Sequence, residues 1–185
     1  MKYRPLFFSL IAGLTALGCE PHCVLEVPSA GRNRLDRICE LIEACSASIH
    51  DLSRITLSGA LRVPRFNMPF ELGLAYATAR RQPHSFFVFE QESHRLQASL
   101  SDLNGLDPYI HHGTQEGIYR SILDCFGTSG RAPSFAALQA LGRGLTRAMM
   151  KLEKEQALSD PFHPYAFRQA VWAATELARD AGLLD

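Results

Sequence analysis

The order of the apolar segments constrains the fold of this chain most. Short apolar runs typical of β-strands alternate with longer segments whose apolar residues recur every three or four positions. The pattern predicts strands at 23–27, 46–52 and 85–89, and helices at 3–18, 34–45 and 68–81. Parallel strands need long crossover connections, which are usually helices. The alternation therefore predicts an α/β fold with an open, doubly wound parallel sheet of the flavodoxin-like type.

The chain changes character after residue 126. Tyr109–His111 is expected to form a last edge strand, followed by a helix at 117–126. Gly127–Pro133 is rich in Gly, Ser and Pro and has the composition of a linker. Helices are expected at 134–157 and 163–183. We therefore predict an α/β domain over residues 1–126 and a helical hairpin over residues 134–185, which either packs on the sheet or pairs with a second copy of the chain.

Charge and cysteine content narrow the class of partner. The chain has 19 basic and 19 acidic residues, which argues against a nucleic-acid groove or an anionic membrane surface. Its five cysteines are odd in number and contain no CxxC pair, as expected of reduced thiols in a reducing compartment. Cys19 and Cys23 lack a matching His or Cys pair, so no metal site is predicted. These features predict a soluble cytoplasmic protein without nucleic-acid or membrane partners.

The N-terminus has two interpretations. A basic start at residues 1–4, an apolar stretch at 6–17 and the pair Gly18-Cys19 resemble a lipoprotein signal peptide. Against this, Ala16 occupies the position three before Cys19 where Leu is usual, and Pro5 interrupts the start. The same residues also suit a buried first helix that ends at Gly18. A membrane-anchored lipoprotein cleaved before Cys19 therefore stays an alternative.

Two carboxylates are the candidate catalytic residues. Ligands of open parallel sheets bind beyond the carboxyl ends of the strands. Asp51 is expected at the end of one strand, and Glu71 in the first turn of the next helix. There, backbone N–H groups and the helix dipole would keep Glu71 ionised, which suits a nucleophile or a stabiliser of a sugar cation. Each residue alone is also common as a turn former or as a charge that complements a helix dipole.

Residues beside Glu71 strengthen the functional interpretation. Arg65 and Asn67 precede it, and Asn67 also suits the N-cap position of the helix. Gly73 follows it, and a residue without a side chain lets a ligand or backbone approach closely. The joint placement of these residues with Asp51 at one sheet edge predicts a ligand site there.

Two stretches resemble a known superfamily. Ile49–Ser53 (IHDLS) and Asn67–Ala77 (NMPFELGLAYA), followed by a strand after Pro83, resemble the nucleoside 2-deoxyribosyltransferase-like and TIR-like superfamily. Tyr3–Phe7 and Arg65–Glu71 are similar, more closely, to a group of uncharacterised bacterial TIR-like proteins. The resemblance covers roughly residues 3–126.

The resemblance implies cleavage or transfer of an N-glycosidic bond to a nucleobase or nicotinamide. A nucleoside, a nucleotide or NAD would be the substrate, and no cofactor is implied. By matching position, Glu71 would attack or stabilise the anomeric carbon, Asp51 would orient the base or sugar, and Asn67 would fix Glu71 or a ribose hydroxyl.

Three further residues flank the pocket that this assignment implies. They are His50, Ser53 and Arg54. His50 alternates with Asp51 along the strand and can instead point into the core. Two classes of function therefore remain open: an N-glycosidase or deoxyribosyltransferase, and a non-catalytic nucleotide-sensing or oligomerising module.

The resemblance also implies a strand that the sequence does not offer. Such domains begin with a central strand before the first helix, whereas here the helix pattern begins at residue 3. Either the chain has an internal start, or the sheet has a gap. The chain would then pair 23–27 directly with 46–52, take a strand from a partner, or stay marginally stable.

Overall fold

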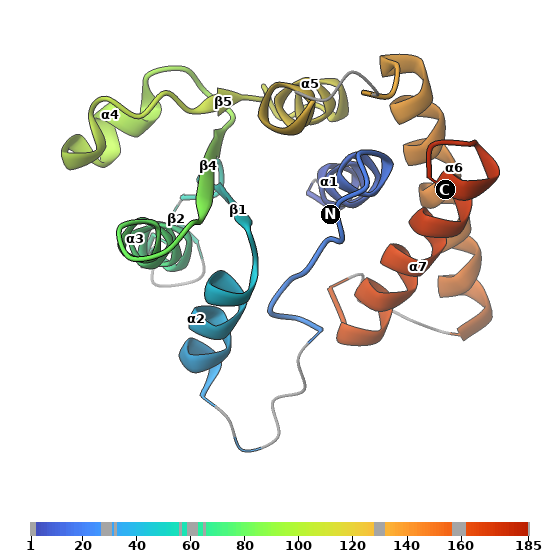
Figure 1. The fold of residues 1–185 in the computed structure, drawn as a ribbon, viewed down its shortest axis with the longest axis horizontal. Coiled ribbons are helices and arrows are strands. Elements are labelled where there is room, and N and C mark those ends of the chain that lie inside the picture. Colours follow the sequence, from blue (N-terminus) through green and yellow to red (C-terminus); the bar gives the residue numbers. More distant parts are fainter. Residues whose placement is uncertain are drawn as a thin grey trace. The chain divides into compact units, whose positions relative to one another are not determined.

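The computed structural model describes residues 3–26, 31, 33–55, 57–58, 63–64, 66–127, 132–156 and 162–184. The chain forms two compact units. Met1–Ala30 and Thr114–Asp185 form one, here called the helical unit, and Gly31–Gly113 form the other, the sheet unit. This division differs from the sequence-based boundary after residue 126, because the first helix and the helix after Thr114 pack with the C-terminal hairpin. The fold is mixed α/β (Figure 1).

Four helices make up the helical unit. They are α1 (Arg4–Ala16), α5 (Gln115–Phe126), α6 (Phe135–Gln156) and α7 (Pro164–Asp180). Helix α1 contacts each of the other three, and α6 packs against α7 as a hairpin (Figure 1). The apolar side chains around α1 are buried, with Phe8 only 1% exposed. The first helix is therefore the centre of this unit's core.

Two glycines shape the helical unit: Gly18 at the end of α1 and Gly142 at the contact between α5 and α6. Gly18 has φ +76°, and the N–H groups of Gly18 and Cys19 donate to the carbonyls of Thr15 and Leu14. This left-handed turn confirms that Gly18 stops the first helix, which spans Arg4–Ala16 within the predicted range 3–18. Gly142 lies under the buried Tyr119, whose hydroxyl would be 1.8 Å from an added Cβ. Its missing side chain thus lets α5 and α6 approach each other.

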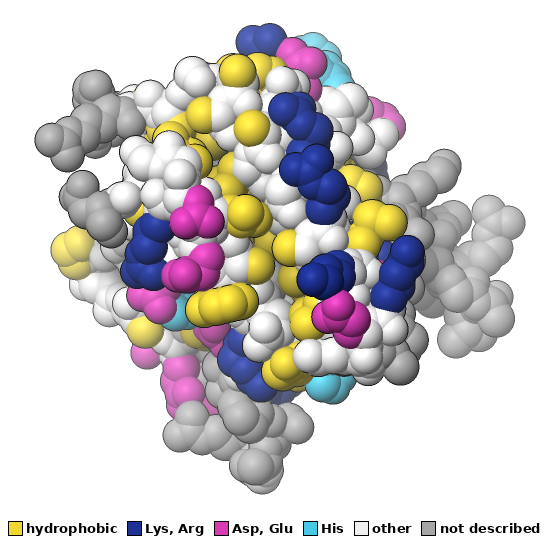
Figure 2. Space-filling view, turned by 90° about the vertical axis from the view of Figure 1, so that its right-hand side faces the viewer, with side chains coloured by type: hydrophobic (Ala, Val, Ile, Leu, Met, Phe, Trp, Pro, Cys, Tyr) yellow, Lys and Arg dark blue, Asp and Glu magenta, His cyan; other side chains and the backbone are white. Residues whose placement is uncertain are grey.

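Few large apolar side chains of the helical unit face outward. Met150 on α6 and Trp172 on α7 are 49% and 63% exposed. On the face of the molecule seen in Figure 2, apolar side chains lie dispersed among basic, acidic and uncharged ones. Pairing of the C-terminal helices with a second copy stays a prediction.

The sheet unit contains a small parallel sheet. Its strands are β1 (Ala47–Asp51), β4 (Ser85–Glu90) and β5 (Tyr109–Ile110), in the order β1-β4-β5. Both pairings are parallel, with Asp51 opposite Phe89 and Phe89 opposite Tyr109. The predicted strands at 46–52 and 85–89 are therefore confirmed as parallel neighbours. Between residues 51 and 67, β2 (Leu57–Ser58) and β3 (Val63–Pro64) pair as an antiparallel hairpin.

The helices of the sheet unit are α2 (Arg34–Ala44), α3 (Asn67–Ala79), α4 (Arg95–Ser99) and the 3₁₀-helix η1 (Ser101–Leu103). Asn33 caps α2 by accepting the Leu35 N–H. Leu52 and Val88 from one sheet face pack with Leu72 of α3 and Leu96 of α4. Helices α3 and α4 thus cover this face, and the doubly wound arrangement stays a prediction.

The predicted strand at 23–27 is wrong. Residues 23–26 form a turn, and Val27 lies outside the described residues. The Glu26 N–H donates to the Cys23 carbonyl at 3.1 Å, and the Glu26 carboxylate lies 2.7 Å from Nδ1 of His22. In a strand, the backbone N–H and C=O groups would instead form hydrogen bonds with a neighbouring strand. Residues 23–26 therefore do not pair with β1.

Three properties concern the described part of the chain as a whole. None of its helices combines the length and apolarity that crossing a bilayer requires. The five cysteines are partly buried and form no disulfide. The described residues hold no group of three or more His, Cys, Asp or Glu side chains arranged to bind a metal.

Candidate functional site

Three buried ionisable side chains lie at the carboxyl edge of the sheet. Asp51 ends β1, Glu90 ends β4, and His111 directly follows β5. Their exposed fractions are 7%, 1% and 0%. Because parallel strands place their carboxyl ends at one edge, where ligands of such sheets bind, this is the candidate site. We call these three residues, with Ser53 and Arg95, the edge cluster.

Asp51 and His111 meet across β4, the strand between them. The Nε2 atom of His111 lies 3.4 Å from Oδ1 of Asp51, which also accepts the Ser53 N–H at 2.9 Å. The Gly113 N–H donates to Nδ1 of His111 at 3.0 Å. Since Nδ1 accepts this bond, the ring proton is on Nε2 and is donated to Asp51. The carboxylate is therefore held by two donors.

Glu90 and Arg95 form the second half of the edge cluster. Oε1 of Glu90 accepts the Gln91 N–H at 2.6 Å and lies 3.4 Å from the Arg95 guanidinium. The same guanidinium donates to the carbonyls of Ser53 at 3.2 Å and Ile55 at 2.8 Å. A buried carboxylate is costly unless it is paired, and Arg95 supplies the pairing while it fixes the turn after β1.

Glu71 differs from its predicted state. Helix α3 begins at Asn67, so Glu71 lies in its second turn, and the first turn contains no acidic residue. Burial raises the pKa of the Glu71 carboxyl, and the Arg34 guanidinium partly opposes this. The predicted placement of Glu71 in the first turn of the helix is therefore wrong, and burial acts against the charged form that the prediction favoured. A raised pKa suits proton transfer better than a permanently charged group would.

Asp51 and the helix that carries Glu71 lie on opposite faces of the sheet. The side chain of Asp51 shares a sheet face with Phe89, whereas His50 shares the other face with Val88. Helix α3 packs on the Val88 face through Leu72. The structure thus brings Asp51 together with Ser53, and it places Glu71 on the helix that covers the opposite face.

The other predicted residues around Glu71 are spread along the start of α3. Asn67 is exposed and is the first residue of the helix, while Phe66 occupies the cap position without a side-chain bond. The prediction of Asn67 as N-cap is therefore wrong. Gly73 and Arg54 are exposed, and Arg65 lies outside the described residues.

His50 is buried on the core face of β1. Its Nε2 lies 2.9 Å from the Ser48 hydroxyl, which in turn lies 2.9 Å from Nε2 of His84. Nδ1 of His84 lies 2.9 Å from the Cys45 carbonyl, so it carries that ring's proton. Burial first, and the charge of His84 second, lower the pKa of His50 to about 4. His50 is therefore a neutral core residue in this structure at neutral pH.

No protein-family model, curated protein or solved structure matches this chain. Function is therefore inferred from the chemistry of the edge cluster and of α3. Buried ionisable groups gathered at a sheet's ligand-binding edge are typical of functional sites, although structural ion pairs also produce them. The edge cluster offers carboxylate acceptors fixed by hydrogen bonds, which can orient hydroxyl and N–H groups of a small molecule.

Glu90, Arg95 and His111 were not predicted as site residues. Two of them could have been predicted from a sequence pattern. Glu90 directly follows the apolar run at 86–89, and His111 directly follows Tyr109-Ile110. The same pattern, an ionisable residue at the end of an apolar strand, identified Asp51. Arg95 has no such pattern, because its contacts depend on how α4 folds back toward the turn after β1.

Proposed function

We propose that this chain binds a nucleoside or nucleotide, NAD included, at the carboxyl edge of its sheet and cleaves or transfers the N-glycosidic bond. The observation that carries the proposal is the buried contact between Asp51 and His111 at this edge. The similarity of Ile49–Ser53 and Asn67–Ala77 to deoxyribosyltransferase-like and TIR-like sequences supports the same chemistry.

Asp51 would act in this proposal as the group that orients the ligand. Its carboxylate is held in one orientation by the Ser53 N–H and the His111 ring. A fixed acceptor binds a sugar hydroxyl or a base N–H at smaller entropic cost than a mobile one. His111 would then be a positioning residue, since it acts through Asp51.

Glu71 would act at the anomeric carbon. In the reaction, the bond between the anomeric carbon and the base nitrogen breaks, and its electron pair leaves with the base; a nucleobase then takes up a proton, whereas nicotinamide leaves as a neutral molecule. Water or a second base then forms the new bond to the sugar and releases a proton to solvent. The ionised carboxylate of Glu71 stabilises the cationic sugar, and the proton that a departing nucleobase takes up comes from solvent.

The test is the release of free base from nucleosides, deoxynucleosides and NAD, measured by chromatography. We expect Glu71→Gln to abolish release while ligand binding is retained. Glu43→Gln removes an exposed helical carboxylate of the same unit and should leave release unchanged. Base release by Glu71→Gln at the wild-type rate would contradict the assigned role.

A non-catalytic nucleotide-sensing or oligomerising module is the second candidate. One observation favours it: Asp51 and the helix that carries Glu71 belong to opposite faces of the sheet. This candidate expects nucleotide binding, measured by calorimetry, that weakens in Asp51→Asn, together with no base release by the wild-type protein. Detectable turnover that depends on Glu71 would exclude it.

A further inference from the structure

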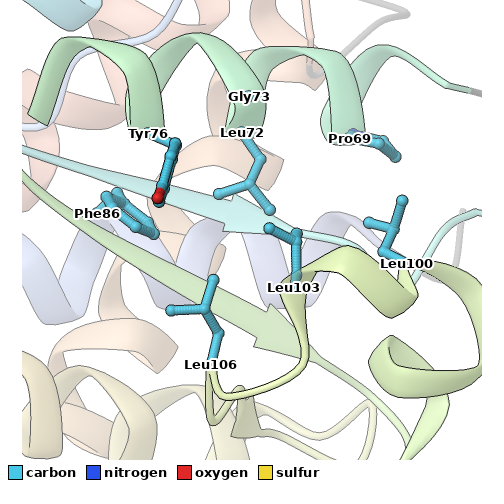
Figure 3. Close-up of a pocket in the computed structure, with 8 residues that line it drawn as sticks. All are labelled: Pro69, Leu72, Gly73, Tyr76, Phe86, Leu100, Leu103 and Leu106. Carbon is cyan, nitrogen blue, oxygen red and sulfur yellow. The ribbon is translucent and has the colours of Figure 1, made fainter. Parts of the chain in front are cut away.

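An apolar hollow of about 220 Å³ lies between α3 and the segment at 100–106. Its walls include four leucines and two aromatic rings, namely Leu72, Leu100, Leu103, Leu106, Tyr76 and Phe86. Figure 3 shows these side chains directed toward a shared space, with the helix above and the 100–106 segment opposite. The hollow therefore belongs entirely to the sheet unit.

The chemistry of the walls determines which ligands fit. None of the residues that line the hollow carries a charge. A charged ligand would lose its hydration there without gaining a partner, so an uncharged ligand is favoured. The one side-chain polar group on the lining is the hydroxyl of Tyr76, a residue that is 46% exposed. One hydrogen bond at the mouth can therefore orient a bound molecule.

The size and shape of the hollow favour a flat ring. The rings of Tyr76 and Phe86 meet edge to face, with centroids 6.0 Å apart and an interplanar angle of 69°. A third aromatic ring can extend such an arrangement. A cavity of about 150 Å³ lined by apolar residues is known to hold benzene. The larger hollow here has room for two fused rings.

Gly73 leaves the helix side of the hollow open. A Cβ added at Gly73 would meet no heavy atom within 4 Å. Pro69, Gly73 and Tyr76 are spaced by four and three residues and share one side of α3. Glu71 lies two residues from both Pro69 and Gly73, so its side chain leaves the helix in a different direction. The hollow is therefore separate from the carboxylate that the proposed function uses.

We propose that this hollow is a binding site for a small, uncharged aromatic molecule of one or two rings, which hydrogen-bonds the Tyr76 hydroxyl. Its position beside the core residues Leu72 and Phe86 means that an occupied hollow stabilises the packing of α3 and the 100–106 segment on the sheet.

Titration with indole, followed by amide chemical shifts, tests this proposal. We expect saturable shifts concentrated at the residues of the hollow, with a dissociation constant in the micromolar to millimolar range. Indole-3-acetate, which adds a carboxylate, should bind at least several-fold more weakly. Tyr76→Phe should weaken indole binding several-fold, because it keeps the ring and removes the hydroxyl. Absence of saturable shifts in the wild-type protein would overturn the proposal.

A substitution that fills the hollow tests the proposal more directly than Tyr76→Phe does. Gly73→Leu places a side chain where no atom stands and should abolish indole binding while the circular dichroism spectrum is unchanged. Ala44→Leu adds the same side chain at the exposed end of α2 and should leave binding intact. Unchanged indole binding by folded Gly73→Leu would overturn the proposal. A concentration-dependent dimer of the wild-type protein that Gly73→Leu dissociates and Ala44→Leu does not would also overturn the proposal. In that case a second copy of the chain, and not a small molecule, would occupy the hollow.

Discussion

The Nε2 atom of His111 lies 3.4 Å from Oδ1 of Asp51, and this contact links the ends of β5 and β1 across β4. Both side chains are buried, so the contact is shielded from water. The same oxygen of Asp51 accepts the Ser53 N–H, and thereby also defines the turn after β1. Asp51 thus has a structural role at the carboxyl edge whatever ligand binds there.

Asp51→Ala should destabilise the protein. It leaves the Ser53 N–H and the Nε2–H of His111 without this acceptor in a buried place, and each loss costs about 1–3 kcal/mol. Asp51→Asn keeps an acceptor oxygen and should cost less. Urea denaturation monitored by circular dichroism measures both changes. Asp107→Ala, at an exposed position of the same unit, is the control and should fall within about 0.5 kcal/mol of wild type. Equal stability of Asp51→Ala and Asp107→Ala would contradict the structural role.

Sequence patterns predicted the helices and the longer strands well, because the periodicity of apolar residues follows burial directly. The amphipathic pattern before Cys45 corresponds to α2, and the apolar run at 85–89 corresponds to β4. Residues 23–27 have equally good β-propensity, yet 23–26 form a turn. A strand needs a partner, and short segments with similar propensity do not reveal whether one is available.

The candidate site was only partly predictable for a related reason. Asp51 was found because it ends an apolar strand, and that is a local property. Its contact with His111 depends on the register of β1 and β5 against β4, which joins residues 60 positions apart. The position of Glu71 depended on the first residue of α3: the predicted helix began at residue 68, whereas α3 begins at Asn67, and this difference of one residue moves Glu71 from the first turn into the second.

Gly142→Ala should destabilise the helical unit. Its Cβ would stand 1.8 Å from the Tyr119 hydroxyl, and the ring is buried, so the α5–α6 contact must shift. Overpacking of this kind costs about 1–3 kcal/mol, against a gain of up to about 1 kcal/mol from helix propensity. Thermal unfolding should show a lower Tm.

Gly144→Ala is the matched control for Gly142→Ala. Its Cβ would lie 3.3 Å from a flexible methyl of Leu177, so we expect stability equal to or above wild type. Tyr119→Phe removes the atom nearest to the new Cβ, and the double variant with Gly142→Ala should therefore lose less stability than the sum of the single changes. Strict additivity would show that the clash does not govern the effect.

Stability should fall as the pH drops from about 6.5 to about 4. The pKa of His50 is lowered to about 4 in the folded protein, so in this interval the unfolded chain binds more protons than the folded one. The contribution is fully present above about pH 6.5, and a pKa lowered from 6.5 to about 4 corresponds to roughly 3 kcal/mol. Protonation would put a donor on Nδ1, a buried atom without a hydrogen-bond partner among the described residues.

Denaturation at a series of pH values checks the role of His50. We expect His50→Asn to lower stability at neutral pH and to flatten the pH dependence between 4 and 6.5. The exposed His94, replaced by Asn as a control, should leave the pH dependence unchanged. An equally steep pH dependence in His50→Asn would assign it to other groups, of which His84 is the nearest candidate.

Phe8→Ala should strongly destabilise the helical unit. Phe8 is 1% exposed and belongs to the core that α1 shares with α5, α6 and α7. Truncation of a buried phenylalanine costs about 3–5 kcal/mol, whereas Trp172→Ala at an exposed position should cost about 0.5 kcal/mol or less.

Cleavage before Cys19, as the lipoprotein alternative requires, would remove α1 altogether. Intact mass of the protein from its own host detects such cleavage, and a folded helical unit lacking residues 1–18 would contradict the central role of α1.

Arg34→Gln should raise the pKa of Glu71 further. Burial raises this pKa and the positive charge of Arg34 opposes the rise, so removal of the charge leaves burial less opposed. Titration of the Glu71 carboxyl carbon by NMR measures the change. Arg80→Gln, an exposed position just after α3, should leave the titration unaffected.

The same substitution connects the electrostatics of Glu71 to the proposed chemistry. A carboxyl whose pKa is raised in the folded state stabilises the protein fully below the unfolded pKa, and this contribution disappears as pH rises through the folded pKa. If ionised Glu71 stabilises the cationic sugar, the acidic limb of the pH–rate profile for base release must follow its pKa. Arg34→Gln should then shift that limb to higher pH by the amount that NMR measures. If the NMR titration of Glu71 shifts and the pH–rate profile does not, ionisation of Glu71 does not control base release, and the proposed catalytic role is contradicted.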